Sequence, residues 1–265
     1  LYGGVQPTKS RAVQVTDNTG MMEDYSEVDK ALVEMAGNPA AFRLQEDRPH
    51  IEGMNQEVAS TLFYGDESTA PEEFTGLSAR YNSLSAENGD NIIAGGGSGS
   101  DNASIWLICW GPNTCHGIIP KGSKAGIQQR DLGEVTLENA DGSNGRMQAF
   151  RTHYRWDVGL SVRDWRYAVR IANIDRSALT FNAASGANLN DLMHQAWTEL
   201  PSTTAGRCSW YMDKSILSML RRQTSSAVEN STLSVDMVGG TMQTSWGGIP
   251  IRRCDALRGN EATVS

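Results

Sequence analysis

Four histidines and four cysteines are the side chains of this sequence best suited to metal binding or nucleophilic chemistry. They are His50, His116, His153 and His194, with Cys109, Cys115, Cys208 and Cys254. No two histidines have the spacing of a metal pair, and no two cysteines form the CxxC of a zinc site. Cys115 and His116 are adjacent, and in a strand this does not place the thiol against the imidazole. We therefore expect structural or solvent-facing histidines, four reduced cysteines and no metal site.

Carboxylates and glycines also gather locally without completing a catalytic pattern. The carboxylates Asp66, Glu67, Glu72 and Glu73 crowd one polar segment that has no apolar pocket to raise a pKa, which predicts a solvated acidic loop. The run "AGGGSGSDN" is followed by the strand-like "SIWLICWG", not by a helix and GK[ST], so it predicts a flexible connector instead of a phosphate-binding loop. A GxSxG nucleophile elbow is also missing. We predict no catalytic residues, no cofactor-binding residues and no enzyme activity.

The net negative charge of the chain argues against a protein that binds nucleic acid tightly. The 265 residues carry a formal net charge of -8 with an isoelectric point near 5.1. A protein that tracks nucleic-acid phosphates would show a basic stripe. The acidic charge fits a chain that lies beside nucleic acid without binding it tightly, and it fits equally a charge that only keeps the protein in solution. We find no signal peptide, membrane-spanning run or lipidation motif, and reduced cysteines are typical of the cytosol. The chain opens at Leu1 within a strand-like pattern, so we expect an upstream segment.

Helical patterns follow an extended start at residues 1–19. The run "YSEVDKALVEMAGNP", residues 25–39, predicts a helix capped by Ser26 with Asp29 at the capping-box position. Residues 38–64 predict the longest amphipathic helix, with a kink at Pro49 or a restart capped by Asp47, and with Gly65 at its end. Residues 66–103 predict mostly loop with little to bury.

The rest of the chain predicts a mixed α+β class. "SIWLICWG" is apolar on both faces and predicts a strand in a covered sheet. The alternation of residues 154–162 and 165–171 changes parity at Arg163 and Asp164, which predicts a bend between two strands buried on one side, with Arg166 and Arg170 pointing outward. Four further elements are predicted: a helix at 188–201 capped by Asn188, a strand and then a helix capped by Asp213 at 208–223, and a strand with Ile249 and Ile251 inward after a Gly247–Gly248 turn.

Several stretches together resemble the major capsid proteins of tailed bacteriophages. "MNQEVASTLFYGDESTAPEEFTGL", residues 54–77, is similar to the end of the family's spine helix with its Gly-Asp turn. "CSWYMDKSILSMLRRQ" resembles the strand and capped helix of the axial domain, and "WGGIPIRRCDAL" resembles its G-I-P strand. The runs "VQVTDNTGMMEDYSEVDKAL", "SIWLICWGPNT", "PKGSKAG" and "VGLSVRDWRYAVRIANI" are similar to the capsid proteins of short-tailed podophages, so the resemblance covers nearly the whole chain.

The resemblance implies the α+β fold of tailed-phage major capsid proteins, with an axial domain, a peripheral domain with a long spine helix, and an extended loop. The element order is permuted relative to the commonest form of the family, because the long strands at 152–173 precede the G-I-P segment. The implied domains are 1–19 as the returning strand of the extended loop, 20–103 as the peripheral domain with spine helix and connector, 104–180 as the long-strand region of the peripheral and axial sheet, and 181–265 as the axial domain.

The implied function is that of a structural, non-enzymatic subunit that assembles as pentamers and hexamers into an icosahedral phage head enclosing double-stranded DNA. Implied partners are copies of the chain, portal, scaffolding and cement proteins, and packaged DNA through weak non-specific contact, with no membrane. Assembly in the host cytoplasm and residence in the virion are implied too. A decoration or tail protein is the alternative, and an enzyme would need a carboxylate or His116 in a closed pocket. Candidates for ion pairs between subunits, or for solvated strand edges, are Arg163, Arg166, Arg170, Arg252 and Arg253.

Overall fold

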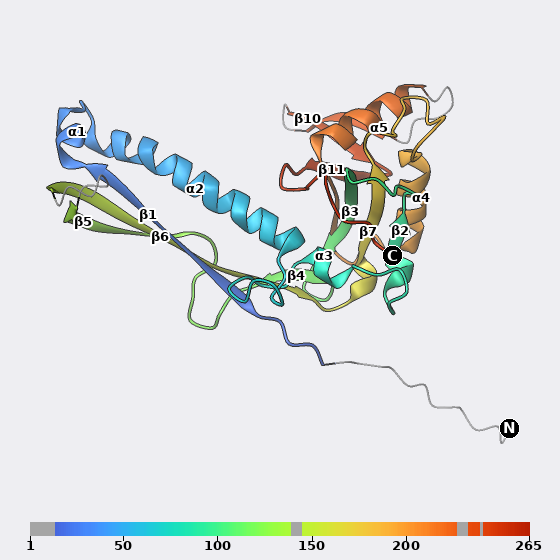
Figure 1. The fold of residues 1–265 in the computed structure, drawn as a ribbon, viewed down its shortest axis with the longest axis horizontal. Helices are drawn as coiled ribbons and strands as arrows, with labels where there is room; N and C mark the ends of the chain where they lie inside the picture. The colour runs from blue at the N-terminus through green and yellow to red at the C-terminus, as the bar shows by residue number, and fades with distance from the viewer. Residues whose placement is uncertain (1–13, 139–144, 227–232, 239–240) are drawn as a thin grey trace, which may run out of the picture.

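The molecule consists of a long arm joined at one end to a rounded head (Figure 1). This computed structural model describes residues 14–138, 145–226, 233–238 and 241–265. Most of the segment 1–19, which the sequence predicts as extended, therefore lies outside the described residues. The arm is built from β1 (Thr19–Asp29), α1 (Lys30–Met35), α2 (Pro39–Tyr64), β5 (Gln128–Glu138) and most of β6 (Arg146–Val162).

The central strand of the arm is β6. It pairs in antiparallel register with β1 on one side, where Thr19 lies opposite Gly159, and with β5 on the other, where Gln128 lies opposite Arg155. The helix α2 runs along this sheet (Figure 1). Along β1 the even-numbered residues are more buried than the odd-numbered ones, because the even face is the one covered by α2.

The start of the arm differs from the prediction. Ser26, predicted as a helix cap, lies in β1 opposite Thr152, and Asp29 caps the shorter helix α1 by accepting the Ala31 N–H at 2.9 Å. Pairing with β6 satisfies the backbone of residues 25–29, so tertiary contact overrides the local capping signal. The next helix, α2, is capped by Asn38 and runs through Pro49 to Tyr64 as one element, so no restart occurs at Asp47.

Beyond the arm, β6 enters the head, and the chain turns at 163–167 through a short 3-10 helix, η2 (Trp165–Tyr167), into β7 (Ala168–Asp175). The predicted bend between the two strands is therefore confirmed. The prediction that the second strand is buried on one side is wrong, because Ala168 to Ile174 are all buried and β7 packs between two core layers. Arg170 consequently points inward, with 3% of its surface exposed.

The head contains the strands β2 (Ile92–Ala94), β3 (Asn102–Trp110), β4 (Cys115–Ile118), β8 (Arg207–Met212), β9 (Leu233–Val238), β10 (Thr241–Trp246) and β11 (Ile249–Arg253). The sheet order is β1-β6-β4-β3-β8-β11-β10-β9, with β7 pairing β3 and β2. The strand β3 is buried on both faces, as its unbroken apolar pattern predicts. Its odd-numbered residues join one core cluster with α4 (Leu189–Glu199) and α5 (Lys214–Ser226), and Trp106 and Ile108 join a second cluster with the end of α2.

The local predictions for the last third of the chain are confirmed. Asn188 caps α4 by accepting the Asp191 N–H, and Asp213 accepts the Ser215 N–H at the start of α5. Gly247 and Gly248 form the turn between β10 and β11 with φ values of +59° and +77°, a region that favours glycine. The predicted helix stripe and both inward isoleucines are buried: Leu189, Leu192, Met193, Ala196, Leu200, Ile249 and Ile251.

The segment 66–103 buries more than predicted. It contains α3 (Leu77–Arg80), the 3-10 helix η1 (Gly89–Asn91) and β2. Phe74, Leu77 and Tyr81 of this segment are buried in the second core cluster, where Tyr81 meets Trp106 edge to face. Their spacing of three and four residues matches one face of a helix, but Pro71 and Gly76 lie in the same polar segment and favoured a loop, so the buried face was missed.

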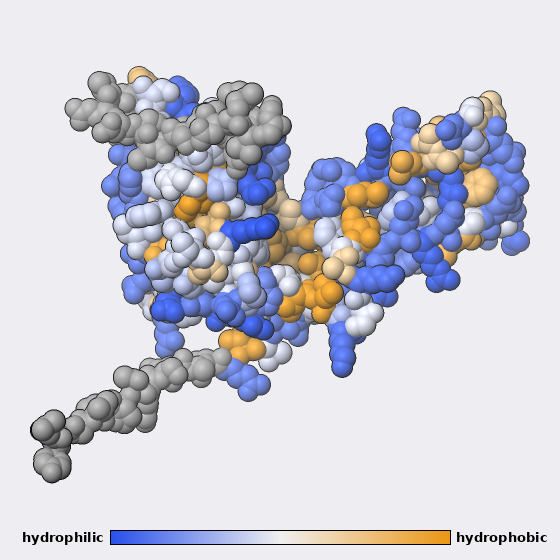
Figure 2. All heavy atoms as spheres, turned by 180° about the vertical axis from the view of Figure 1, so that it is seen from behind, coloured by the Kyte–Doolittle hydropathy of each residue, from blue (hydrophilic) through white to orange (hydrophobic). Residues whose placement is uncertain are grey.

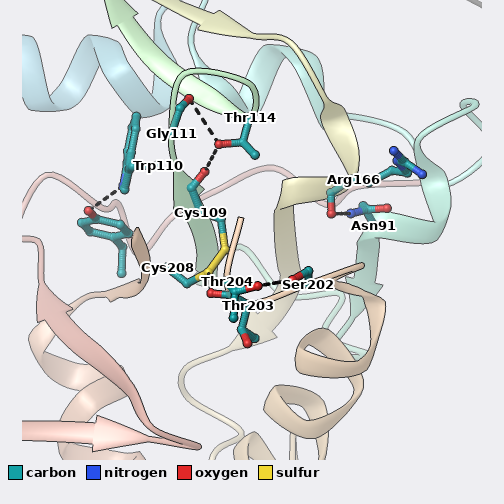
Figure 3. The surroundings of a disulfide bond; sticks show 11 residues. Asn91, Cys109, Trp110, Gly111, Thr114, Arg166, Ser202, Thr203, Thr204 and Cys208 are labelled. Carbon is teal, nitrogen blue, oxygen red and sulfur yellow. Dashed lines mark hydrogen bonds between the residues drawn. A yellow bond between two sulfur atoms is a disulfide. The ribbon is translucent and has the colours of Figure 1, made fainter. Parts of the chain in front are cut away.

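The cysteine prediction is wrong for two residues. Cys109 of β3 and Cys208 of β8 are joined by a disulfide (Figure 3), whereas Cys115 and Cys254 are free. The two bonded residues lie directly opposite one another in the antiparallel pair β3–β8. They are 99 residues apart in the sequence, so no short spacing pattern could reveal the pair.

Candidate inter-subunit surface

The arm has no hydrophobic core of its own. Both core clusters lie in the head and at its junction with the arm, and they include no described side chain from 19–61 or 128–157. Buried apolar side chains in those ranges are few and scattered: Val28, Val33, Met54, Ala149 and Tyr154. Since burial of apolar surface is the dominant stabilising contribution to folding, the arm by itself is held weakly.

Polar contacts fix the helix of the arm to its sheet. Arg43 of α2 donates two hydrogen bonds of 3.0 Å to the carboxylate of Asp131 in β5, and a third of 3.1 Å to Thr152 in β6. The Arg43 guanidinium lowers the pKa of Asp131 below its usual value. The other ion pairs between arm elements include Lys30–Glu134, His50–Asp24 and Arg151–Glu27. These pairs are partly solvated, so each contributes orientation more than stability.

Large apolar side chains are nevertheless exposed along the arm. Leu32 and Met35 of α1 lie at the far end of the arm and are 54% and 83% exposed, and Leu44 of α2 is exposed as well. Met21 and Tyr25 project from the odd-numbered face of β1, away from α2. The space-filling view shows hydrophobic residues along the arm and at its junction with the head (Figure 2). Exposed apolar residues gathered on an element without a core are typical of a surface covered by another chain.

Two adjoining hollows lie between α2 and β1, with volumes of about 410 Å³ and about 240 Å³. They share Met22 and Glu57 and are open to solvent. The apolar part of their lining includes Met54, Val58 and Phe74. The acidic residues of the lining are Glu23, Asp24, Glu57, Glu72 and Glu73. An open groove with an apolar lining and acidic groups suits a chain segment with apolar and basic side chains better than it suits a small substrate.

A buried polar network joins the arm to the head. Glu261, near the C-terminal end, accepts hydrogen bonds from Arg170 of β7 at 2.7 Å, from Tyr64 at the end of α2 at 2.5 Å, and from Ser104 of β3. Arg170 also donates to the Tyr81 carbonyl at 2.7 Å. Burial, and then the nearby Glu261 carboxylate, raise the pKa of the Tyr64 hydroxyl. One carboxylate thereby connects three elements at the point where the arm leaves the head.

The five arginines expected at strand edges are placed differently from one another. Arg170 is buried in the network above and cannot reach a neighbouring molecule, so that prediction is wrong. Its partner Glu261 lies 91 residues away in the sequence, which is why strand alternation misplaced it. Arg163 donates to the Pro112 carbonyl, Arg166 pairs with Asp164, and Arg253 pairs with Asp255. Arg252 is exposed. A role for these exposed arginines between subunits stays a prediction.

The histidines lie on separate elements. His50 of α2 contacts Asp24 at 2.8 Å, the His153 ring stacks on Tyr25 with centroids 4.7 Å apart, and the exposed His194 packs against Trp246. His116 lies in β4 beside β6, and its Nδ1 atom is buried without a hydrogen-bond partner. In the described part of the chain, no three His, Cys, Asp or Glu side chains form a metal-binding group. No helix among the described residues is long and apolar enough to cross a membrane.

An elongated arm whose described side chains form no core, with exposed apolar residues and a well-packed head, is typical of a structural protein whose surface is covered by other chains. Comparison with known proteins gives the family: the family model of the major capsid protein GP7 matches residues 1–265, and the chain belongs to this family. Its fold is similar to that of a chain in the near-atomic-resolution cryo-EM structure of bacteriophage Epsilon15. The TM-score is 0.70 with 37% identity, covering 99% of this chain and 79% of that chain. No curated protein sequence matches.

The predicted family, the α+β capsid fold and the structural role in a phage virion are therefore confirmed. The groove, the arm surface and the buried network were not predicted from the sequence. The sequence of β1, TGMMEDYSEVD, does not alternate apolar and polar residues, so it gave no signal that Met21 and Tyr25 lie on the solvent side of a half-covered strand.

Proposed function

We propose that this major capsid protein assembles as pentamers and hexamers into an icosahedral head, with the arm of each copy overlapping a neighbour. The observation that supports the overlap is the arm itself, which exposes Leu32, Met35 and Met21 and, among the described residues, reaches a core cluster only where it joins the head. Contacts along an element of this length would bury more than the roughly 1,600 Å² of a standard interface. Repeated contacts between unlike surfaces close into five-fold and six-fold rings.

In this proposal the arm corresponds to the peripheral domain of the family, and the part of the head formed by 181–265 corresponds to the axial domain. Residues 1–19 would belong to an extended loop that lies on an adjacent copy. The acidic groove between α2 and β1 would receive an apolar and basic segment of a neighbour. The negative charge of the chain also suits a wall that surrounds packed DNA without binding it tightly.

Further partners follow from the role of a shell subunit. A shell that is filled with DNA needs a portal. A scaffolding protein would set the curvature of the shell as it grows. A cement protein would bind the outer surface where the arms meet. Assembly would take place in the host cytoplasm, before release of the virion. The chain would carry no enzyme activity of its own.

The overlap can be tested with two matched variants. Leu32→Glu places a charge at the end of the arm, and Phe181→Glu places one on the head at nearly the same exposure, 54% against 53%. Both changes are on the surface and should leave the melting temperature of the unassembled chain unchanged. In electron micrographs we expect shells from the wild type, and free capsomers or monomers from Leu32→Glu.

Phe181→Glu should assemble, which would show that the arm, and not apolar exposure in general, drives assembly. Normal shells from Leu32→Glu and from the double variant Leu32→Glu/Met35→Glu would contradict the overlap. A wild-type chain that stays monomeric under all assembly conditions would contradict the proposed assembly altogether.

A further inference from the structure

The disulfide of the head crosses the centre of its sheet. Cys109 of β3 and Cys208 of β8 are opposite residues, and the pairing continues on one side to Trp110 opposite Arg207 and on the other to Trp106 opposite Tyr211. In Figure 3 the bond connects the two strands next to Trp110. The Trp110 indole N–H donates a hydrogen bond of 2.9 Å to the Tyr211 hydroxyl on the neighbouring strand. Backbone pairing and this side-chain contact hold the two cysteines opposite each other independently of the covalent bond.

The head does not need the bond in order to form. Both cysteines belong to a core cluster with Leu107 and Trp210, among many other buried apolar residues. A reduced cysteine packs as a small apolar side chain, so the same cluster can form around two thiols. The fold therefore positions the thiols first, and oxidation can follow at any later time.

Access to the two sulfurs is unequal. Cys109 is fully buried, whereas Cys208 is 9% exposed and its Sγ atom lies 3.4 Å from the carbonyl oxygen of Thr203, in the exposed turn that precedes β8. Figure 3 places this turn directly beside the bond. The other cysteines are less suitable: burial raises the pKa of the Cys115 thiol to about 12, and that residue lies opposite Val162, not opposite a cysteine. Cys208, which is less buried than Cys109 and lies next to this exposed turn, is therefore the thiol that we expect a small oxidant to reach first.

We propose that this bond is a covalent lock that closes after the shell has assembled. The inference rests on the proposed assembly in the cytoplasm, where thiols are kept reduced, and on later release into oxidising surroundings. The oxidant is a low-molecular-weight disulfide such as oxidised glutathione. The Cys208 thiolate attacks one of its sulfurs and releases one glutathione thiolate, and Cys109 then attacks the Cys208 sulfur and releases the second. Two protein thiols are oxidised, one small disulfide is reduced to two thiols, and the two protons lost by the protein thiols end on the two released glutathione thiolates.

The expected consequence of the disulfide is a higher melting temperature of the chain. The bond joins positions 99 residues apart, and the enclosed chain includes β5, β6, β7 and α4. A crosslink over a loop of this length restricts the unfolded chain strongly. For a chain of this size the expected rise in melting temperature is roughly 5–15 °C.

The experiment counts free thiols before and after release. Cells that express the chain are lysed in N-ethylmaleimide, shells are purified and then denatured in fresh N-ethylmaleimide so that buried thiols react too, and intact mass gives the number of alkylated cysteines per chain. We expect four alkylated cysteines per chain in shells alkylated at lysis. Shells purified without alkylation and then incubated with oxidised glutathione should give two alkylated cysteines per chain, with a matching rise in melting temperature. The variant Cys208→Ser should lose the rise, and Cys254→Ser should keep it.

Two results would overturn the lock: only two alkylated cysteines already in the shells alkylated at lysis, or four after prolonged exposure to oxidised glutathione. The thiol count uses the wild-type chain, so it decides the matter even if Cys208→Ser fails to fold. Failure of the assembly proposal is distinguishable, because micrographs would then show no shells in any sample.

Discussion

Removing the Glu261 carboxylate is the most informative single perturbation of this fold. The side chains of Arg170 and Glu261 are 3% and 5% exposed, and their nearest atoms are 2.7 Å apart. Glu261→Leu would leave a buried guanidinium without its counter-ion and would also remove the acceptor for Tyr64 and Ser104. Breaking a buried pair in this way typically costs about 3–5 kcal/mol. That is a large part of the roughly 5–15 kcal/mol by which domains are stable.

The assay is urea unfolding of the unassembled chain at a fixed protein concentration. We expect Glu261→Leu to lower the free energy of unfolding by about 3–5 kcal/mol, or the melting temperature by roughly 6–20 °C. The double variant Arg170→Met/Glu261→Leu should recover most of the loss, since replacing both members of a buried pair with apolar side chains is often neutral. Glu87→Leu, a change at an exposed glutamate, serves as control.

A loss below about 1 kcal/mol for Glu261→Leu would refute the reasoning, because that value is typical of solvated pairs. Strict additivity of the two single changes in the double variant would refute it as well, since residues in one network should couple.

Two further predictions concern local features. Gly248→Ala should destabilise the chain by about 1–2 kcal/mol because residue 248 has φ +77°. Gly37→Ala should be neutral or slightly stabilising, because a Cβ added at residue 37 meets no atom within 4 Å. Equal effects of the two changes in urea unfolding would contradict this. The pKa of Asp131 is lowered by Arg43, so the stability from this pair should be present above the unfolded pKa of about 3.9 and lost as the pH falls through the lower folded value. Arg43→Gln should therefore reduce the difference in urea midpoint between pH 6 and pH 2.5, and an unchanged difference would argue against the pair.

Much of the fold was predictable because the signals were local. The apolar run of β3, the stripe of α4 and the caps Asn188 and Asp213 each depend on residues within one element, and all four were placed correctly. The resemblance to phage capsid proteins was also carried by short motifs in order along the chain. Where a local signal competed with strand pairing, as at Ser26, the pairing prevailed because it satisfies a whole backbone segment at once.

The sequence by itself determined the class of fold, the family and the acidic character of the chain, since each of these depends on composition or on neighbouring residues. Only the tertiary structure decided which polar and reactive groups meet. Cys109 and Cys208 are 99 residues apart, and Arg170 and Glu261 are 91 apart, yet both pairs are in direct contact. Arg170 lies on a strand whose sequence alternates, yet it points inward, because segments distant in the sequence cover both faces of β7. The arm differs: distant strands pair within it, but its described side chains between 19 and 61 and between 128 and 157 join neither core cluster, so Leu32 and Met35 at its end stay exposed.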